Sequence, residues 1–129
     1  DRFREWNDAR GHMAGDRVLL RAARALQDAS RPQDFVARYG GDEYAVVLGE
    51  VDAESLPPLV ERLRGALGTA LAEETGGFLT SASVGTAIYD GSRHRTPEDL
   101  LRDADRALYE ARELRRRQAP AQAARGARW

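Results

Sequence analysis

Two short runs of strand-forming residues flank a Gly-Gly pair and two carboxylates, and this pattern constrains the fold more than any other feature of the chain. The runs are Phe35–Tyr39 and Tyr44–Leu48, which are rich in β-branched and aromatic side chains. The segment between them, Gly40–Glu43, contains residue types that favour turns. The pattern therefore predicts a β-hairpin with Asp42 and Glu43 at its tip.

Helical periodicity is found on both sides of this hairpin. In Asp16–Leu26 the apolar residues recur on one face with arginines opposite, which is typical of an amphipathic helix. A second apolar stripe follows Ser55, and its two prolines fall in the first turn, where a missing N–H costs little. A third helix is predicted to begin at Thr96, with Pro97 and acidic residues in its first turn and a buried stripe over Leu101–Ala111.

The remaining segments predict a loop, one more strand and a tail. Turn-forming residues dominate Asn7–Gly15, which we expect to be an ordered loop. We expect Phe78–Tyr89 to form a long strand, in which Gly85 marks a bulge or a close backbone approach. Gln118–Trp129 shows no periodicity and is expected to be a disordered C-terminal tail. The order of the elements indicates an α/β fold, an α+β sandwich with a mainly antiparallel sheet.

Composition narrows the classes of function. The 129 residues suit one domain, and 20 basic against 21 acidic residues give a net charge of -1, so no global basic field favours nucleic acid or an anionic membrane. The absence of cysteine excludes disulfides, thiolate zinc sites and cysteine nucleophiles. No apolar run approaches the roughly 20 residues that span a bilayer. We therefore expect a soluble, cytoplasmic domain that contacts neither nucleic acid nor membrane.

The residue types in Gly40–Glu43 also indicate a chemistry. Glycines let a backbone turn tightly and approach a ligand closely. Two adjacent carboxylates can hold Mg²⁺, which neutralises phosphate charge and activates the attacking oxygen when a phosphoryl group is transferred from a nucleotide. Taken alone, these four residues are more simply interpreted as an ordinary Gly-Gly-Asp turn. The surrounding sequence favours the interpretation as a metal-binding site for phosphoryl transfer.

Four motifs, in order along the chain, resemble the GGDEF family, the diguanylate cyclases. Gly40–Tyr44 matches the signature, with Tyr44 where the family has Phe. The segment Asp1–Asp16 resembles D-x-F-K-x-x-N-D followed by G-H-x-x-G-D. Ser83–Gly85 resembles the family's S-I-G strand, and Ala104–Arg112 resembles its A-D-x-A-L-Y-x-A-K helix. The resemblance covers nearly the whole chain.

The resemblance implies a GGDEF domain over residues 1–117, followed by the tail 118–129. Its fold would be that of polymerase palms and nucleotide cyclases, a central mainly antiparallel sheet flanked by helices. The implied reaction converts two GTP into cyclic di-GMP with release of two pyrophosphates, and uses Mg²⁺ or Mn²⁺. Because each 3′-hydroxyl must attack the α-phosphorus of the other nucleotide, two domains must face one another in a homodimer. The alternative is a catalytically silent GGDEF domain that acts as a receptor for cyclic di-GMP or GTP.

Motif matching also implies roles for single residues. The catalytic signature corresponds to Gly40, Gly41, Asp42 and Glu43, and its two carboxylates match those assigned to metal binding and hydroxyl activation. The positions that match GTP-binding residues are Asn7 and Asp16 for guanine, and Phe3, Arg4, Arg112 and Arg116 for the phosphates. Without the motif, Arg112 and Arg116 would be interpreted as a solvated basic helix end. We expect His12 to be structural.

A second site is implied by Arg31-Pro32-Gln33-Asp34, which stands before Gly40 at the offset of the family's inhibitory R-x-x-D motif. In this interpretation Arg31 and Asp34, with Arg62 on the next helix, bind cyclic di-GMP and cause product inhibition. The alternative interpretation of the tetrad is an ordinary surface loop.

One position of the family pattern falls before the first residue. The family's first metal ligand is an Asp two residues before the position of Asp1, on the first strand of the central sheet. We therefore expect the chain to lack that strand and to belong to a longer parent, because a sheet without its central strand leaves open edges. We expect the 129 residues alone to bind Mg²⁺-GTP weakly and to make no product.

Overall fold

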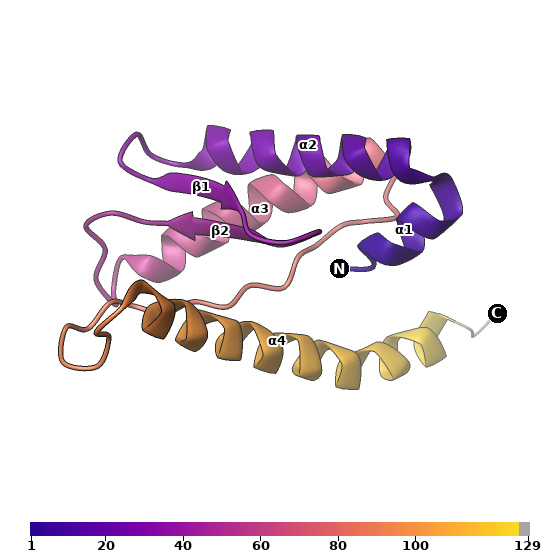
Figure 1. Ribbon diagram of the computed structural model, residues 1–129. Coiled ribbons are helices and arrows are strands. Elements are labelled where there is room, and N and C mark those ends of the chain that lie inside the picture. The colour runs from indigo at the N-terminus through magenta and orange to yellow at the C-terminus, as the bar shows by residue number, and fades with distance from the viewer. Residues whose placement is uncertain (127–129) are drawn as a thin grey trace. The chain divides into compact units, whose positions relative to one another are not determined.

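The chain divides into two compact units, Asp1–Ala82 and Ser83–Trp129. The computed structural model describes residues 1–126, with side chains described through residue 118. Figure 1 shows the elements of the first unit, which are α1 (Phe3–Arg10), α2 (His12–Ala29), β1 (Phe35–Arg38), β2 (Tyr44–Val47) and α3 (Leu56–Thr75). The second unit contains the segment before α4 and α4 itself (Pro97–Gly126). Among the described residues, no helix is long and apolar enough to cross a membrane.

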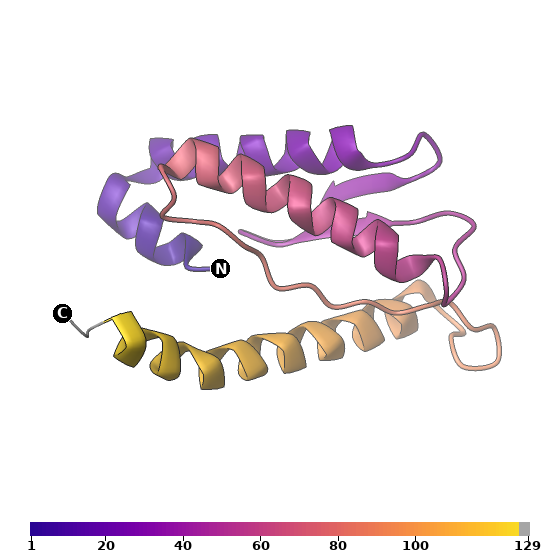
Figure 2. The same ribbon diagram turned by 180° about the vertical axis from the view of Figure 1, so that it is seen from behind.

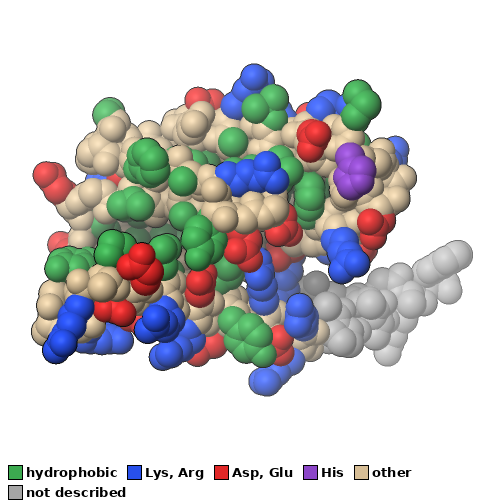
Figure 3. Space-filling view, viewed as in Figure 1, with side chains coloured by type: hydrophobic (Ala, Val, Ile, Leu, Met, Phe, Trp, Pro, Cys, Tyr) green, Lys and Arg blue, Asp and Glu red, His purple; other side chains and the backbone are tan. Residues whose placement is uncertain are grey.

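The predicted hairpin is confirmed. β1 and β2 pair antiparallel, with Phe35 opposite Val47 and Arg38 opposite Tyr44. Because side chains alternate along a strand, Arg38 and Tyr44 share one face and Phe35 and Val47 share the other. Phe35 and Val47 are 66% and 62% exposed, and apolar side chains are visible among charged ones over the hairpin (Figure 3).

The core of the first unit forms where α1, α2 and α3 meet. α2 and α3 lie side by side, as both views show (Figures 1 and 2). The buried residues that pack together there are Trp6, Ala14, Val18, Ala22, Leu71 and Leu79. Outside this core, Arg21 of α2 forms an ion pair with Glu73 of α3 at 2.8 Å. The apolar stripe predicted for Asp16–Leu26 is therefore confirmed as the buried face of α2.

The loop expected over Asn7–Gly15 is wrong, because most of that segment is helical. α1 runs to Arg10 and α2 begins at His12, so the chain turns at Gly11 alone. Gly11 takes a left-handed φ of 88°, and its N–H donates to the Asn7 carbonyl at 2.8 Å. The change of direction between α1 and α2 thus needs only Gly11, and the other turn-forming residues of Asn7–Gly15 are helical. Asp16 consequently lies inside α2 and not at its N-terminus.

The strand expected over Phe78–Tyr89 is also wrong. Within the described residues, the sheet consists of β1 and β2. Strand-forming composition favours extended backbone, but a strand also needs a neighbour that accepts and donates its ladder hydrogen bonds. The close approach expected at Gly85 is confirmed, because a Cβ there would collide with the backbone of Ala104 and Leu108 in α4.

Helix α4 continues past the end that the sequence indicated. Residues after Arg117 were expected to lack regular structure, yet the helix extends to Gly126. Alanine, glutamine and arginine in this run favour helix, whereas Pro120 lies inside the helix and cannot donate a ladder hydrogen bond. Residues 127–129 of the expected tail, including Trp129, lie outside the described residues.

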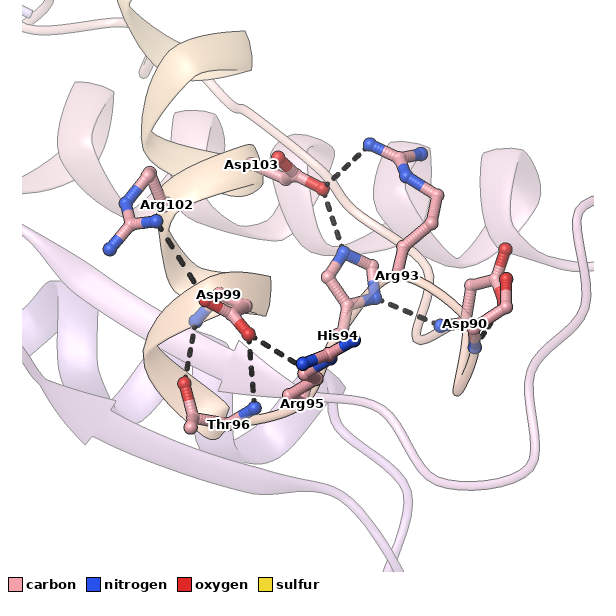
Figure 4. Close-up of polar contacts among 9 residues, drawn as sticks. Asp90, Arg93, His94, Arg95, Thr96, Asp99, Arg102 and Asp103 are labelled. Carbon is pink, nitrogen blue, oxygen red and sulfur yellow. Dashed lines mark hydrogen bonds and ion pairs between the residues drawn. The ribbon is translucent and has the colours of Figure 1, made fainter.

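A polar network holds the loop before α4 (Figure 4). The backbone N–H of Asp90 donates to Nδ1 of His94 at 2.9 Å, so the other ring nitrogen, Nε2, carries the proton. Nε2 lies 2.7 Å from Oδ2 of Asp103, to which Arg93 also donates at 3.2 Å. The bond from His94 holds the pKa of Asp103 below its usual range. This network ties the loop to the second turn of α4.

The predicted start of α4 at Thr96 is confirmed. The carboxylate of Asp99 accepts from the backbone N–H groups of Arg95 and Thr96 at 2.9 and 3.1 Å. The Asp99 N–H in turn lies 3.3 Å from the Thr96 hydroxyl oxygen, which completes a reciprocal cap. Pro97 is the first helical residue, where it needs no N–H partner.

Two glycines of α3 give opposite predictions for the same substitution. A Cβ at Gly68 would lie 2.8 Å from the Thr80 carbonyl oxygen, whereas a Cβ at Gly65 meets nothing within 4 Å. We expect Gly68→Ala to lower the free energy of unfolding by about 1–3 kcal/mol, because the backbone of residue 80 must shift. Gly65→Ala should raise it by about 0.5–1 kcal/mol, since alanine favours helix. Urea unfolding of both variants is the measurement, and equal effects would contradict the packing of α3 against residue 80.

Candidate functional site

The tip of the hairpin is held by its own backbone and by Arg38. The N–H groups of Tyr39 and Gly40 donate to the Glu43 carbonyl at 2.8 and 3.2 Å. The Arg38 guanidinium donates to the carbonyls of Gly40 and Gly41 at 3.1 and 2.7 Å. These bonds engage tip carbonyls, while the Asp42 side chain is exposed and Glu43 is half-buried. The two carboxylates are thus presented on a tip of defined shape.

The two glycines of the tip are not required by the fold. Neither Gly40 nor Gly41 has a positive φ. A Cβ at Gly41 meets nothing within 4 Å, and one at Gly40 makes ordinary contact with Glu43 at 3.6 Å. The tight turn expected of these glycines therefore does not explain them. Open backbone at this position leaves room for a ligand to approach.

The donors at the tip suit a metal that is shared with a substrate. Among the described residues, no group of three or more His, Cys, Asp or Glu side chains could hold a metal ion. Asp42 and Glu43 supply two adjacent carboxylates. Magnesium is commonly bound by one or two protein carboxylates together with substrate phosphates, and these two residues fit that partial set.

A second group of candidate residues meets at the corner between α1 and α2. The Asn7 amide and the Phe3 ring both lie against Gly15, where any Cβ would collide with the Asn7 side chain. Asn7 Nδ2 donates to Nδ1 of His12 at 3.3 Å, so His12 helps to orient the amide. Asp16 follows Gly15 and is exposed. The corner therefore brings the side chains of Phe3 and Asn7 together, and Asp16 is the next residue after the glycine that they contact.

The hairpin is tied to α2 through Tyr44, a residue whose role the sequence did not reveal. The Tyr44 hydroxyl donates to the Leu19 carbonyl at 2.6 Å. Burial raises the pKa of this phenol. The available signal was the tyrosine itself, which adds a hydroxyl where the family signature has phenylalanine.

Arg31 and Asp34 are bonded to each other. Arg31 Nε and Nη2 donate to the two Asp34 carboxylate oxygens at 3.1 and 2.8 Å, and Nη2 also donates to the Gly49 carbonyl at 2.7 Å. The Asp34 carboxylate accepts the Gly49 N–H as well, at 3.2 Å, and its side chain is 1% exposed. The bond from Arg31 holds the pKa of Asp34 below its usual value of 3.8 despite burial. The pair clasps the loop before β1 to the residues after β2.

The other candidate arginines lie on helix surfaces. Arg4 is exposed on α1 and Arg62 is exposed on α3. Arg112 and Arg116 lie one turn apart on α4 in the second unit, where Arg116 donates to Glu113 at 2.9 Å.

A comparison with protein families decides what kind of domain carries these features. The model of the family described as "Diguanylate cyclase, GGDEF domain" matches residues 1–118. The chain belongs to the GGDEF family. Its hairpin tip carries Gly-Gly-Asp-Glu at residues 40–43.

Relatives of this GGDEF domain include proteins named as diguanylate cyclases. It is 37% identical over 114 residues to Diguanylate cyclase DosC of Escherichia coli K12, a match that covers 87% of this chain and 24% of DosC. It is 38% identical over 115 residues to Diguanylate cyclase TpbB of Pseudomonas aeruginosa, covering 87% of this chain and 26% of TpbB. The chain thus spans about a quarter of the length of these relatives.

Solved structures confirm the fold class. Diguanylate cyclase SiaD of Pseudomonas aeruginosa, solved in complex with its activator SiaC, superposes with a TM-score of 0.77 at 35% identity, over 88% of this chain and 43% of SiaD. The GGDEF domain of YfiN (TpbB) from the same organism gives a TM-score of 0.70 at 34% identity, over 88% of this chain and 71% of that structure. The α/β GGDEF fold implied by the sequence is therefore confirmed.

The Arg31–Asp34 clasp predicts a dependence of stability on pH. A carboxyl whose pKa is lowered in the folded state stabilises the fold above its usual pKa of 3.8, and this contribution is lost as the pH falls toward the folded-state pKa. We expect Asp34→Asn to lower the free energy of unfolding by about 1.5–3 kcal/mol at pH 7, because it removes a charge-assisted bond to Arg31. The difference should shrink below about pH 4.

Urea unfolding at several pH values measures this effect. Asp28→Asn is the matched control, because Asp28 is exposed in the last turn of α2, and it should change the free energy by no more than about 0.5 kcal/mol. A difference between wild type and Asp34→Asn that stayed constant from pH 7 to pH 2 would show that the clasp has no ionic character.

Proposed function

We propose that this domain condenses two molecules of GTP into cyclic di-GMP and releases two pyrophosphates. The observation that carries the proposal is the intact Gly40–Glu43 tip, with both carboxylates presented, in a domain of the GGDEF family. Two relatives that are 37% and 38% identical to it over the aligned residues are named diguanylate cyclases. The domain boundary at residue 117 and the residue roles below are part of the proposal.

Guanine recognition is assigned to the corner between α1 and α2. The Asn7 amide and the Asp16 carboxylate offer donors and an acceptor suited to the edge of the base. The Asn7 side chain is held by His12 and by contact with Gly15, so it is oriented before a ligand binds. The motif match assigns phosphate binding to the backbone near Phe3 and to Arg4, and it assigns contacts with the terminal phosphates to Arg112 and Arg116.

The carboxylates of Asp42 and Glu43 hold Mg²⁺ or Mn²⁺ together with the phosphates of the nucleotide. When bound, the metal neutralises phosphate charge and lowers the pKa of the attacking 3′-hydroxyl. Asp42 and Glu43 would between them hold the metal and accept the single proton of the hydroxyl, and pyrophosphate would leave the α-phosphorus. Open backbone at Gly41 leaves room for the phosphates. Each hydroxyl attacks the α-phosphorus of the nucleotide on the facing domain, so two copies work as a homodimer.

The proposal is tested with GTP and Mg²⁺ in the complete natural chain that contains these residues. We expect cyclic di-GMP to accumulate, as resolved by chromatography. Glu43→Gln keeps the shape of the side chain and removes its charge, so turnover should fall at least about 100-fold. Asp28→Asn, a carboxylate outside the site, should leave turnover unchanged.

Other outcomes of this assay have defined meanings. Unchanged turnover in Glu43→Gln would remove Glu43 from the catalytic role. Intact GTP together with tight binding of cyclic di-GMP would favour the receptor function over the enzyme.

Product inhibition is a separate part of the proposal. Arg31, Asp34 and Arg62 would bind cyclic di-GMP, and Arg31 would do so while its Nε and Nη2 are engaged by Asp34 and Gly49. The Arg31 side chain is 24% exposed, which leaves part of it open to a ligand. A product that bound here would lie against the clasp that joins both ends of the hairpin.

Calorimetry with cyclic di-GMP tests the inhibitory site. We expect both Arg31→Ala and Arg62→Ala to weaken binding by at least about tenfold, because each removes charge-assisted bonds to phosphate or guanine. Arg62→Ala separates binding from folding, since Arg62 lies outside the clasp. Identical isotherms for wild type and both variants would eliminate this site.

A further inference from the structure

Tyr44 occupies a distinctive place in the fold. It is the first residue of β2 and follows directly after the two carboxylates of the tip. Its ring packs against the core of the first unit, and its hydroxyl donates to the Leu19 carbonyl at 2.6 Å. Because Glu43 and Tyr44 are consecutive in the chain, a movement of Tyr44 also moves Glu43.

The acceptor of this bond lies on the helix that carries a guanine-binding candidate. Leu19 follows Asp16 by three residues in α2, and residues three apart are neighbours on a helix surface. The hydrogen bond therefore fixes the position of the hairpin along the axis of α2, one turn beyond Asp16. The distance between the carboxylates of the tip and the corner between α1 and α2 depends on this position.

The hydroxyl adds something that the ring alone does not provide. Packing of an aromatic ring against a helix limits its movement, but it does not tie the ring edge to one backbone atom. A hydrogen bond has a preferred length and angle, and it fixes the position of the ring edge. Arg38, opposite Tyr44 in the hairpin, fixes the shape of the tip through the carbonyls of Gly40 and Gly41. Arg38 thus shapes the tip, and Tyr44 places it.

We propose that Tyr44 is a positioning residue, whose hydroxyl holds the Asp42 and Glu43 carboxylates at the correct place along α2 relative to Asp16. This inference rests on the proposed cyclase function for its catalytic consequence. The anchoring of the hairpin can be measured without any activity.

Tyr44→Phe removes the hydroxyl and keeps the ring. The Leu19 carbonyl also belongs to the hydrogen-bond ladder of α2, so it keeps a partner and the fold survives the change. Tyr39→Phe is the matched control, since Tyr39 lies in the same hairpin and its side chain is 55% exposed. Both variants are made in the complete natural chain that contains these residues.

Two readouts are compared between the variants. In Tyr44→Phe, amide hydrogen exchange at residues 39–43 should become about three- to tenfold faster, while the buried amides of α2 and α3 keep their rates. In the GTP assay with Mg²⁺, kcat should fall about three- to tenfold with KM for GTP within about twofold, because misplaced carboxylates impair the chemical step more than nucleotide binding. Tyr39→Phe should match wild type in both.

Each outcome decides a part of the inference. Unchanged exchange at residues 39–43 in Tyr44→Phe would overturn the anchoring role. Faster exchange with unchanged kcat would overturn the catalytic consequence. A wild-type protein that makes no cyclic di-GMP would overturn the proposed function, and the exchange measurement would still decide whether Tyr44 anchors the hairpin.

Discussion

The buried face of α2 is the constraint on which the first unit depends. Ala14, Val18, Ala22 and Leu26 are buried along it, and α1, α3 and β1 all pack against this helix. Small residues at 14, 15 and 22 allow close approach. At Gly15 the neighbour is the Asn7 side chain, so the same packing that closes the core also orients a candidate guanine ligand. The packing at Gly15 therefore contributes both to the stability of the first unit and to the orientation of Asn7.

The hairpin reaches this helix through a polar contact as well as an apolar one. The ring of Tyr44 packs on the core and its hydroxyl bonds to the backbone of α2. Arg38 and the Arg31–Asp34 clasp act on the two ends of the same hairpin, at the tip and at the base. A two-stranded hairpin is marginal by itself, so the contacts of Tyr44 with the core and with α2 are what fix its position on the first unit. The position of the hairpin in turn determines where the carboxylates of Asp42 and Glu43 lie.

The local sequence pattern was sufficient to predict part of the fold and part of the candidate site. The hairpin and the starts of α3 and α4 follow from nearest-neighbour chemistry, and the sequence predicted them. Phe78–Tyr89 depends on a ladder partner, which composition does not specify, and that prediction was wrong. The Arg31–Asp34 bond with Gly49 and the Tyr44–Leu19 bond join residues 15 or more positions apart. No periodicity encodes such contacts, so the structure was needed to find them.

The central claim is that the hairpin tip and the corner between α1 and α2 form one nucleotide site. Amide hydrogen exchange with Mg²⁺ and a GTP analogue that cannot be cleaved between its α- and β-phosphates tests it most directly. The account predicts that protection increases together, with one ligand-concentration dependence, at residues 11–16 and at residues 40–43. Protection at only one of these segments, or at neither with saturating analogue, would contradict the claim.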